Sequence, residues 1–147
     1  MKIIFGLGSN LGDKQPYLDK ALKMLQEKLL LKNLKRSKIL KNSALLLPNS
    51  PESWNQEFFN IAVSAEIDIV NFPPIKILKI VKDIEKELGR VDRGKWSPRE
   101  IDIDILTIEN LVVDEENLKI PHYDLLNRDF FLKTIKEIEP DWQYPKL

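Results

Sequence analysis

The amino-acid sequence predicts an α+β fold whose strands and helices follow one another in the ferredoxin-like order βαββαβ. Residues 59–69 and 101–108 alternate apolar and polar side chains as half-buried strands do. Residues 13–29 and 73–88 carry the apolar spacing of helices that pack on a core. An apolar run also opens the chain at residues 2–8. We expect a sandwich of one sheet with both helices on one face, the other face open, and a C-terminal extension.

The first predicted strand, residues 2–8, is apolar on both faces, which is typical of a strand at the centre of a sheet. The stretch 6–13 reads Gly-Leu-Gly-Ser-Asn-Leu-Gly-Asp. It lacks the Gly-Lys-Ser/Thr of a phosphate-binding loop, and its glycine spacing differs from that of dinucleotide-binding motifs. We interpret it as a tight turn from strand to helix, because glycine tolerates the backbone angles of such a turn.

The first helix is expected to begin near Asp13, with Pro16 in its first turn. Its apolar residues recur at the spacing of one buried helical face: Leu18, Ala21, Leu22, Leu25 and Leu29. A short strand is predicted at 34–40. Residues 41–57 then form a long loop, and loops of that length are uncommon unless they are functional or disordered.

The strand at 59–69 has the most regular alternation in the sequence. One face carries apolar side chains, namely Phe59, Ile61, Val63, Ala65, Ile67 and Ile69. The other face carries Asn60, Ala62, Ser64, Glu66 and Asp68. Pro73 and Pro74 open the second helix, and Gly89 ends it. After the strand at 101–108, we expect a short strand at 111–113 and a helix over 128–138.

The length and charge of the chain limit its class. At 147 residues it is expected to form one domain, residues 1–147. The 23 Lys and Arg residues balance 23 Asp and Glu residues, so nothing in the charge indicates nucleic acid or a membrane as partner. The absence of Cys excludes disulfides and thiolate metal sites. No apolar run approaches the ~18 residues of a membrane span. We expect the protein to be cytoplasmic and monomeric.

Asp102 and Asp104 are unusual in the strand 101–108, because aspartate is a poor strand former. The alternation places both carboxylates on one face, opposite three isoleucines. If the isoleucines meet the helices, both aspartates project to the open face together with Asn60. Their Cα atoms would lie about 7 Å apart, and a hard cation such as Mg²⁺ would remove their repulsion. The simpler alternative is a strand whose Asp face is solvated.

A basic segment directly precedes these carboxylates. Arg90, Arg93, Lys95 and Arg99 lie close together in the sequence, with Trp96 among them. Cations beside a pair of carboxylates that could hold a metal indicate a site for a polyphosphate.

Five sequence blocks connect the chain with a known family. They are Trp-Ser-Pro-Arg-Glu-Ile-Asp-Ile-Asp-Ile-Leu at 96–106, Gly-Ser-Asn-Leu-Gly at 8–12, Phe-Phe-Asn-Ile-Ala-Val at 58–63, Gly-Arg-Val at 89–91, and Pro-His-Tyr-Asp with Asn-Arg-Asp-Phe within 121–130. With these blocks in this order, nearly the whole chain resembles the 6-hydroxymethyl-7,8-dihydropterin pyrophosphokinase family of folate biosynthesis.

The resemblance implies a Mg-dependent transfer of diphosphate from ATP to the hydroxymethyl group of the pterin, with release of AMP. It implies that two Mg²⁺ ions are held by Asp102 and Asp104, and that Arg90 and Arg99 take part in catalysis with them. The segments 41–57 and 89–98 would then act as lids that exclude water.

The resemblance also assigns binding residues. For the pterin they are Ser43, Leu45, Phe58, Asn60, Trp96 and Phe130. For ATP they are Glu85, Lys95, Trp96, Arg99, Ile105, His122, Tyr123 and Arg128.

Taken without the resemblance, these residues have simpler interpretations. Phe58 and Phe130 could be core aromatics, and His122 could be a turn residue. Glu85 and Arg128 could be surface charges. An RNA-binding module of the same fold would need exposed aromatics on the open face and a basic balance. A further alternative is that the chain is an inactive relative that still binds nucleotide.

Overall fold

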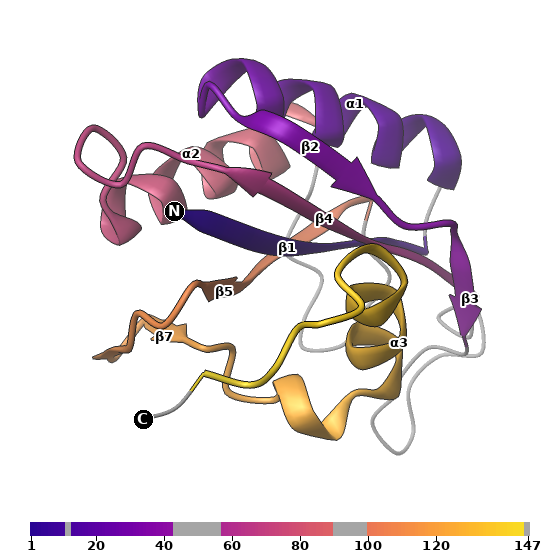
Figure 1. Ribbon diagram of the computed structural model, residues 1–147. Helices are drawn as coiled ribbons and strands as arrows, with labels where there is room; N and C mark the ends of the chain where they lie inside the picture. Colours follow the sequence, from indigo (N-terminus) through magenta and orange to yellow (C-terminus); the bar gives the residue numbers. More distant parts are fainter. Residues whose placement is uncertain (11–12, 43–56, 90–99, 146–147) are drawn as a thin grey trace.

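The structure is a computed structural model that describes residues 1–10, 13–42, 57–89 and 100–145. Its helices and strands in chain order are β1 (Lys2–Ser9), α1 (Lys14–Lys28), β2 (Lys32–Arg36), β3 (Leu40–Asn42), β4 (Phe58–Glu66), α2 (Pro74–Glu87), β5 (Asp102–Ile108), β6 (Val113–Glu115), β7 (Leu118–Ile120), the 3-10 turn η2 (Leu125–Asn127) and α3 (Asp129–Ile138). A five-stranded sheet separates α1 and α2 on one face from α3 on the other (Figure 1). The chain is therefore an α+β protein with three layers.

The strand order across the sheet is β2-β4-β1-β5, and β3 also pairs with β4. All of these pairs are antiparallel. The strand predicted at 34–40 is interrupted and becomes β2 and β3, which both run along β4. Ser37 lies at the interruption, where its backbone N–H donates to the carbonyl of Ala62 at 2.9 Å. Its Oγ accepts from the Ala62 N–H at 3.0 Å, so this side chain takes the place of a backbone acceptor.

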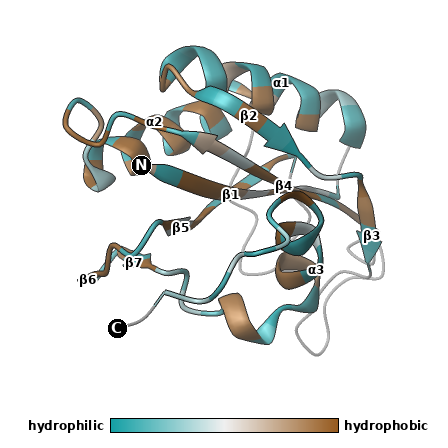
Figure 2. Cartoon of the chain, in the orientation of Figure 1, coloured by the Kyte–Doolittle hydropathy of each residue, from teal (hydrophilic) through white to brown (hydrophobic). Residues whose placement is uncertain are grey.

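The main core lies between the sheet and the two helices α1 and α2. The alternation predicted for β4 is confirmed, because Ile61, Val63, Ala65 and Ile67 are all buried in this core. The helical faces are confirmed as well: Leu18, Ala21 and Leu25 are the buried residues of α1, and Ile77, Val81 and Ile84 are among those of α2. Apolar colouring runs along β1 at the centre of the sheet (Figure 2).

The expectation of an open second face is wrong for part of the sheet. A separate buried cluster joins α3 to this face and consists of Ile4, Ala62, Leu106, Leu125, Phe131, Ile135 and Ile138. The physical reason is that β1, β4 and β5 each present an apolar side chain on this face. Leaving these side chains in water would be unfavourable, and the apolar side of α3 buries them.

The interpretation of the glycine-rich stretch as a turn is also wrong for its first half, because β1 continues through Ser9. Gly6 and Gly8 are therefore strand residues, and each allows a close approach. A Cβ atom at Gly6 would lie 3.0 Å from Cε1 of Phe131, and one at Gly8 would lie 2.9 Å from Oδ1 of Asn60. Glycine is needed at these two positions because the side chains of Phe131 and Asn60 occupy the space of a Cβ atom, and not because the backbone angles are unusual.

The remaining boundaries follow the sequence closely. Gly89 has a φ of 90° directly after α2, as expected of a glycine that ends a helix. The predicted strand at 111–113 is instead a small antiparallel hairpin of β6 and β7. The helix predicted over 128–138 is confirmed as α3. None of the helices in the described ranges combines the length and the apolar content that crossing a membrane requires.

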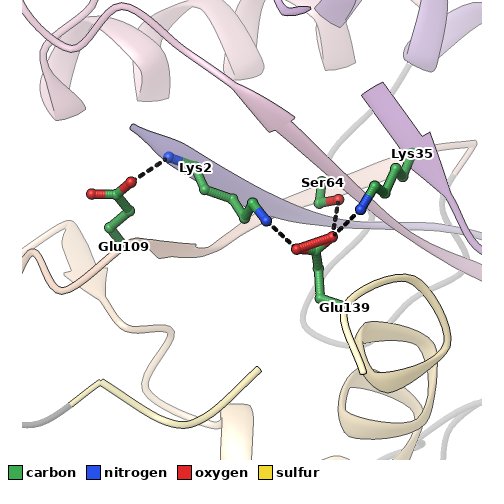
Figure 3. Close-up of polar contacts among 5 residues, drawn as sticks. All are labelled: Lys2, Lys35, Ser64, Glu109 and Glu139. Carbon is green, nitrogen blue, oxygen red and sulfur yellow. Dashed lines mark hydrogen bonds and ion pairs between the residues drawn. The ribbon is translucent and has the colours of Figure 1, made fainter. Parts of the chain in front are cut away.

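Glu139 fastens the end of α3 to the sheet (Figure 3). Its carboxylate accepts from Nζ of Lys2, from Nζ of Lys35 at 3.1 Å and from Oγ of Ser64 at 3.3 Å. Burial alone would raise the pKa of Glu139, but the hydrogen bonds and charges of Lys2 and Lys35 outweigh it and lower the pKa. The charged carboxylate thus connects α3 with β1, β2 and β4.

Candidate active site

The two aspartates and Asn60 lie on one face of the sheet, on either side of β1. Gly8 pairs with Asp102 of β5 and with Asn60 of β4, so these three residues form a row across three strands. Gly6 pairs with Asp104 in the same way. Directly paired residues of an antiparallel sheet point to the same face, which brings both carboxylates and the amide together above two glycines. The shared face of the aspartates is therefore confirmed.

The glycines shape the surface between these side chains. At Gly8 this strip of the face is backbone without a side chain, and a Cβ atom there would meet Oδ1 of Asn60 at 2.9 Å, whereas Gly6 lies under the ring of Phe131. The ring of Phe58 borders the same spot, with Cδ1 at 3.5 Å from that Cβ position. Phe58 and Asn60 share a strand face because they are two residues apart. Gly8 is itself buried, so a flat group lying over this strip would meet the amide of Asn60 and the ring of Phe58.

Asn60 is buried, with 7% of its surface exposed. Its Nδ2 donates to Oδ1 of Asn42 on the neighbouring strand β3, which fixes the orientation of the amide. Phe130 lies on α3 with its ring centroid 4.6 Å from that of Phe131, the residue that contacts the Gly6 position. The three described residues predicted for the pterin thus come from β4 and from the start of α3.

His122 stands beside the second aspartate. Its Nε2 atom is 3.6 Å from Oδ1 of Asp104, and its backbone N–H donates to the carbonyl of Leu106 at 2.9 Å. The backbone N–H of Asp124 donates to Nδ1 of His122 at 3.1 Å. The imidazole ring stacks on Tyr123 at a centroid distance of 4.7 Å. The loop after β7 therefore carries the only His of the chain to the acidic end of β5.

A cavity of about 290 Å³ adjoins this acidic end. Four of the predicted catalytic and nucleotide residues line it: Asp104, Ile105, His122 and Tyr123. The cavity has further lining residues that the sequence analysis missed, namely Leu78 and Lys82 of α2 and residues 116–119 of the β6–β7 hairpin. The helical spacing of α2 and the turn at 116–117 contain no motif, so no sequence signal distinguished these residues from ordinary surface positions.

Comparison with known proteins identifies the family. A family model described as 7,8-dihydro-6-hydroxymethylpterin-pyrophosphokinase matches residues 4–140. The chain belongs to this pyrophosphokinase family. Pyrophosphokinase activity in folate biosynthesis follows from this membership.

Two curated relatives illustrate the range of the family. The 2-amino-4-hydroxy-6-hydroxymethyldihydropteridine pyrophosphokinase of Aquifex aeolicus is 38% identical over 143 residues, covering 97% of this chain and 83% of the relative. The folate synthesis bifunctional protein of Chlamydia caviae is 42% identical, but the match covers 94% of this chain and only 30% of that protein. The chain thus corresponds to less than a third of that bifunctional protein.

Solved structures show the same fold. The wild-type HPPK-DHPS of Plasmodium falciparum matches 99% of this chain and 42% of its own length, with a TM-score of 0.66 at 15% identity. A form of that protein with pterin and p-hydrobenzoate bound gives a TM-score of 0.64 at 17% identity. At these identities the likeness concerns the fold alone.

The simpler interpretation of Glu85 as a surface charge is wrong. Glu85 is buried, with 2% of its surface exposed. Its Oε2 accepts from the Ile103 N–H at 2.8 Å, and its Oε1 lies 3.4 Å from Nζ of Lys82. Glu85 therefore joins α2 to β5 and forms an ion pair with Lys82. Its assignment to ATP stays a prediction.

Arg128 belongs to a small polar network next to His122. Its Nε donates to Oδ2 of Asp124 at 2.8 Å, and its guanidinium lies over the ring of Phe131 at 5.3 Å. Nδ2 of Asn127 donates to Oδ1 of Asp124 at 3.2 Å. The hydrogen bond from Arg128 is the main reason that the pKa of Asp124 is lowered, so this carboxylate is ionised at neutral pH.

The other predicted site residues lie outside the described residues. They are Ser43, Leu45, Arg90, Lys95, Trp96 and Arg99, and most of the two predicted lid segments lies there too. Their assigned roles stay predictions.

Asp102 and Asp104 offer carboxylate oxygens, which are the kind of ligand that Mg²⁺ prefers. Within the described ranges, no three His, Asp or Glu residues gather closely enough to hold a metal ion. Mg²⁺ in nucleotide enzymes is commonly bound by one or two carboxylates plus the phosphates of the substrate. Asp102 and Asp104 are half-buried carboxylates on one face, which fits that mode of binding.

Proposed function

We propose that the chain transfers the β,γ-diphosphate of ATP to the hydroxymethyl oxygen of 6-hydroxymethyl-7,8-dihydropterin and releases AMP. The observation that carries this proposal is the row Asp102–Gly8–Asn60 across three strands. In this row a carboxylate, which would serve metal and phosphate, lies on one side of Gly8, and an amide, which would serve the pterin, lies on the other. The two substrates would thus meet over β1.

The pterin would lie on the strip at Gly8. The Asn60 amide can both donate and accept along the ring edge, and its hydrogen bond to Asn42 fixes its orientation. Phe58 borders the strip, and Phe130 would approach from α3, so aromatic rings could enclose the pterin. The resemblance adds Ser43, Leu45 and Trp96 to this pocket.

ATP would occupy the cavity between α2, β5 and the β6–β7 hairpin. The cavity wall includes Asp104 and His122, so a nucleotide lying there would have its phosphates at the acidic end of β5. Ile105 and Tyr123 also line the cavity and would meet the base and sugar. Glu85, Lys95, Trp96, Arg99 and Arg128 are the further nucleotide residues implied by the resemblance.

Asp102 and Asp104 would hold two Mg²⁺ ions together with phosphate oxygens. When bound, Mg²⁺ neutralises phosphate charge and lowers the pKa of an oxygen that it coordinates. The structure gives these carboxylates a fixed place, because both belong to a strand paired with β1. The residues therefore fit the ions that the family resemblance implies.

The chain contributes mainly position and charge to the reaction. The acceptor oxygen forms a bond to the β-phosphorus, the bond from that phosphorus to the bridging α,β-oxygen breaks, AMP leaves, and the hydroxyl proton is lost to solvent or phosphate. Such transfers need in-line placement and stabilisation of phosphate charge more than covalent chemistry. Arg90 and Arg99 would donate hydrogen bonds from their planar guanidinium groups to the charged phosphate oxygens. The segments 41–57 and 89–98 would exclude competing water.

The fold is best described as ferredoxin-like with an added layer. Counting β2 with β3 as one interrupted strand, the order across the sheet is second, third, first and fourth. Both crossover helices lie on one face, and α3 is the addition on the other (Figure 1). We take residues 1–147 as one domain of a cytoplasmic, monomeric enzyme.

The direct test is a coupled assay of AMP release with ATP, Mg²⁺ and the reduced hydroxymethylpterin. We expect AMP only when both substrates and Mg²⁺ are present, together with the diphosphorylated pterin as product. An inactive relative would bind ATP without releasing AMP. A chain that binds RNA and neither of the two small molecules would also contradict the proposal.

A further inference from the structure

Asp124 contacts two of the residues proposed to bind ATP, and it is not itself one of them. Its backbone N–H donates to Nδ1 of His122, and its carboxylate accepts from Nε of Arg128. Asn127 holds the other carboxylate oxygen. Asp124 is thus the common partner of a His and an Arg that lie six positions apart in the chain.

The bond to His122 selects one form of the neutral imidazole. A nitrogen that accepts a hydrogen bond carries its lone pair, so the proton of the neutral ring must lie on Nε2. Nε2 is the atom that faces Asp104 at 3.6 Å, in the wall of the cavity. In this form His122 offers an N–H donor at the place where the phosphates of ATP would lie.

The bond to Arg128 fixes the guanidinium and determines which of its donors are used. Asp124 engages Nε at 2.8 Å and leaves both Nη groups outside this bond. The ring of Phe131 holds the same guanidinium from one side at 5.3 Å. A guanidinium fixed by its Nε can still present its Nη groups to a phosphate. Arg128 is 19% and Asp124 29% exposed, so the pair is not a fully solvated surface contact.

We propose that Asp124 is a positioning residue for nucleotide binding: it sets His122 and Arg128 in the donor arrangement that receives the phosphates of ATP. This inference rests on the proposed function, because it assumes that these two residues meet ATP. It adds a role for a residue that would touch neither substrate. The alternative is an ion pair that only stabilises the loop, and pairs of that kind contribute little.

The variant Asp124→Asn tests the carboxylate while keeping the backbone N–H and the size of the side chain. We expect the Kd for a non-hydrolysable Mg-ATP analogue, measured by calorimetry, to rise about tenfold, since charge-assisted hydrogen bonds are the stronger ones. The Kd for the pterin and the melting temperature should stay close to wild type. The matched control is Asp19→Asn, which removes the 3.1 Å ion pair with Arg36 on another part of the surface and should change neither Kd.

A double-mutant cycle separates positioning from a general loss of structure. Arg128→Ala alone should weaken binding of the ATP analogue. Adding Asp124→Asn to that variant should raise the Kd by less than a further twofold, because Asp124 acts through Arg128. Fully additive losses, or equal losses for pterin and nucleotide, would overturn the inference. An Arg128→Ala variant that binds the analogue like wild type would instead contradict the proposed place of Arg128 in the nucleotide site.

Discussion

Gly8 of β1 and Asn60 of β4 are paired residues between which no side chain fits. A Cβ atom at position 8 would stand 2.9 Å from Oδ1 of Asn60, which is closer than real Cβ atoms approach an oxygen. The Gly8→Ala variant must therefore displace the amide or the backbone. We expect its pterin affinity to fall about tenfold or more, because a buried amide that loses its geometry loses its hydrogen bonds.

The selectivity of this loss is the informative quantity. Calorimetric titration with the pterin and with an ATP analogue should show a much larger change for the pterin. Gly6→Ala is the comparison, because its Cβ would meet the ring of Phe131 in the core under α3; we expect it to lower the melting temperature. A Gly8→Ala enzyme with wild-type pterin affinity would refute the strip as the pterin surface.

Asn60 offers a second test of the same surface. We expect Asn60→Leu to weaken pterin binding far more than ATP binding, by roughly 1–3 kcal/mol, since the ring edge would lose a partner in a buried site. Equal losses for the two ligands, measured by the same titrations, would count against the placement of the pterin beside β4.

Glu139 makes the stability of the protein depend on pH. Because its folded pKa is lowered, its contribution is present above the unfolded value of about 4.3 and is lost as the pH falls through the folded value. Glu139→Gln should destabilise the fold by about 2 kcal/mol at pH 7, as expected for hydrogen bonds to a charged group. Urea unfolding should show this difference shrinking at pH 3.

The control for this experiment is an exposed ion pair. Glu87 lies 3.1 Å from Lys28, and its side chain is 53% exposed. Glu87→Gln should change the free energy of unfolding only slightly at either pH. A Glu139→Gln effect of the same size at pH 7 and pH 3 would show that the charge is not what fastens α3.

The protonated nitrogen of His122 can be observed directly, because the chain has a single His. Nitrogen-15 NMR of the neutral ring should show a protonated Nε2 and an unprotonated Nδ1, since Nδ1 accepts the Asp124 N–H. The opposite pattern would mean that this hydrogen bond does not form in solution.

Much of the sheet and the first two helices could be predicted from the sequence. An element that is buried on one side has apolar residues that recur at a regular spacing. The strand of Asp102 and Asp104 and the strand of Asn60 were found in this way, and so was their common face. Periodicity could not predict that Asn60 and the two aspartates lie on either side of β1. That arrangement depends on which residues pair with Gly8 and Gly6.

The parts that were missed depend on long-range packing. Ala62 alternates with apolar residues of β4 and was counted with the polar face, yet α3 buries it together with Ile4 and Leu106. The hairpin residues that line the cavity beside Asp104 were missed for a related reason. Leu118 and Lys119 reach the wall of the cavity only because the chain folds back beside β5.

The central claim is that Asp102 and Asp104 carry the diphosphoryl transfer, and AMP release by Asp102→Ala and Asp104→Ala tests it most directly. The account predicts that both variants keep the circular dichroism spectrum of the wild type and lose turnover almost completely, because two carboxylates are the proposed ligands of Mg²⁺. An activity within about tenfold of wild type in either variant, a loss of no more than ~1.4 kcal/mol, would contradict the account.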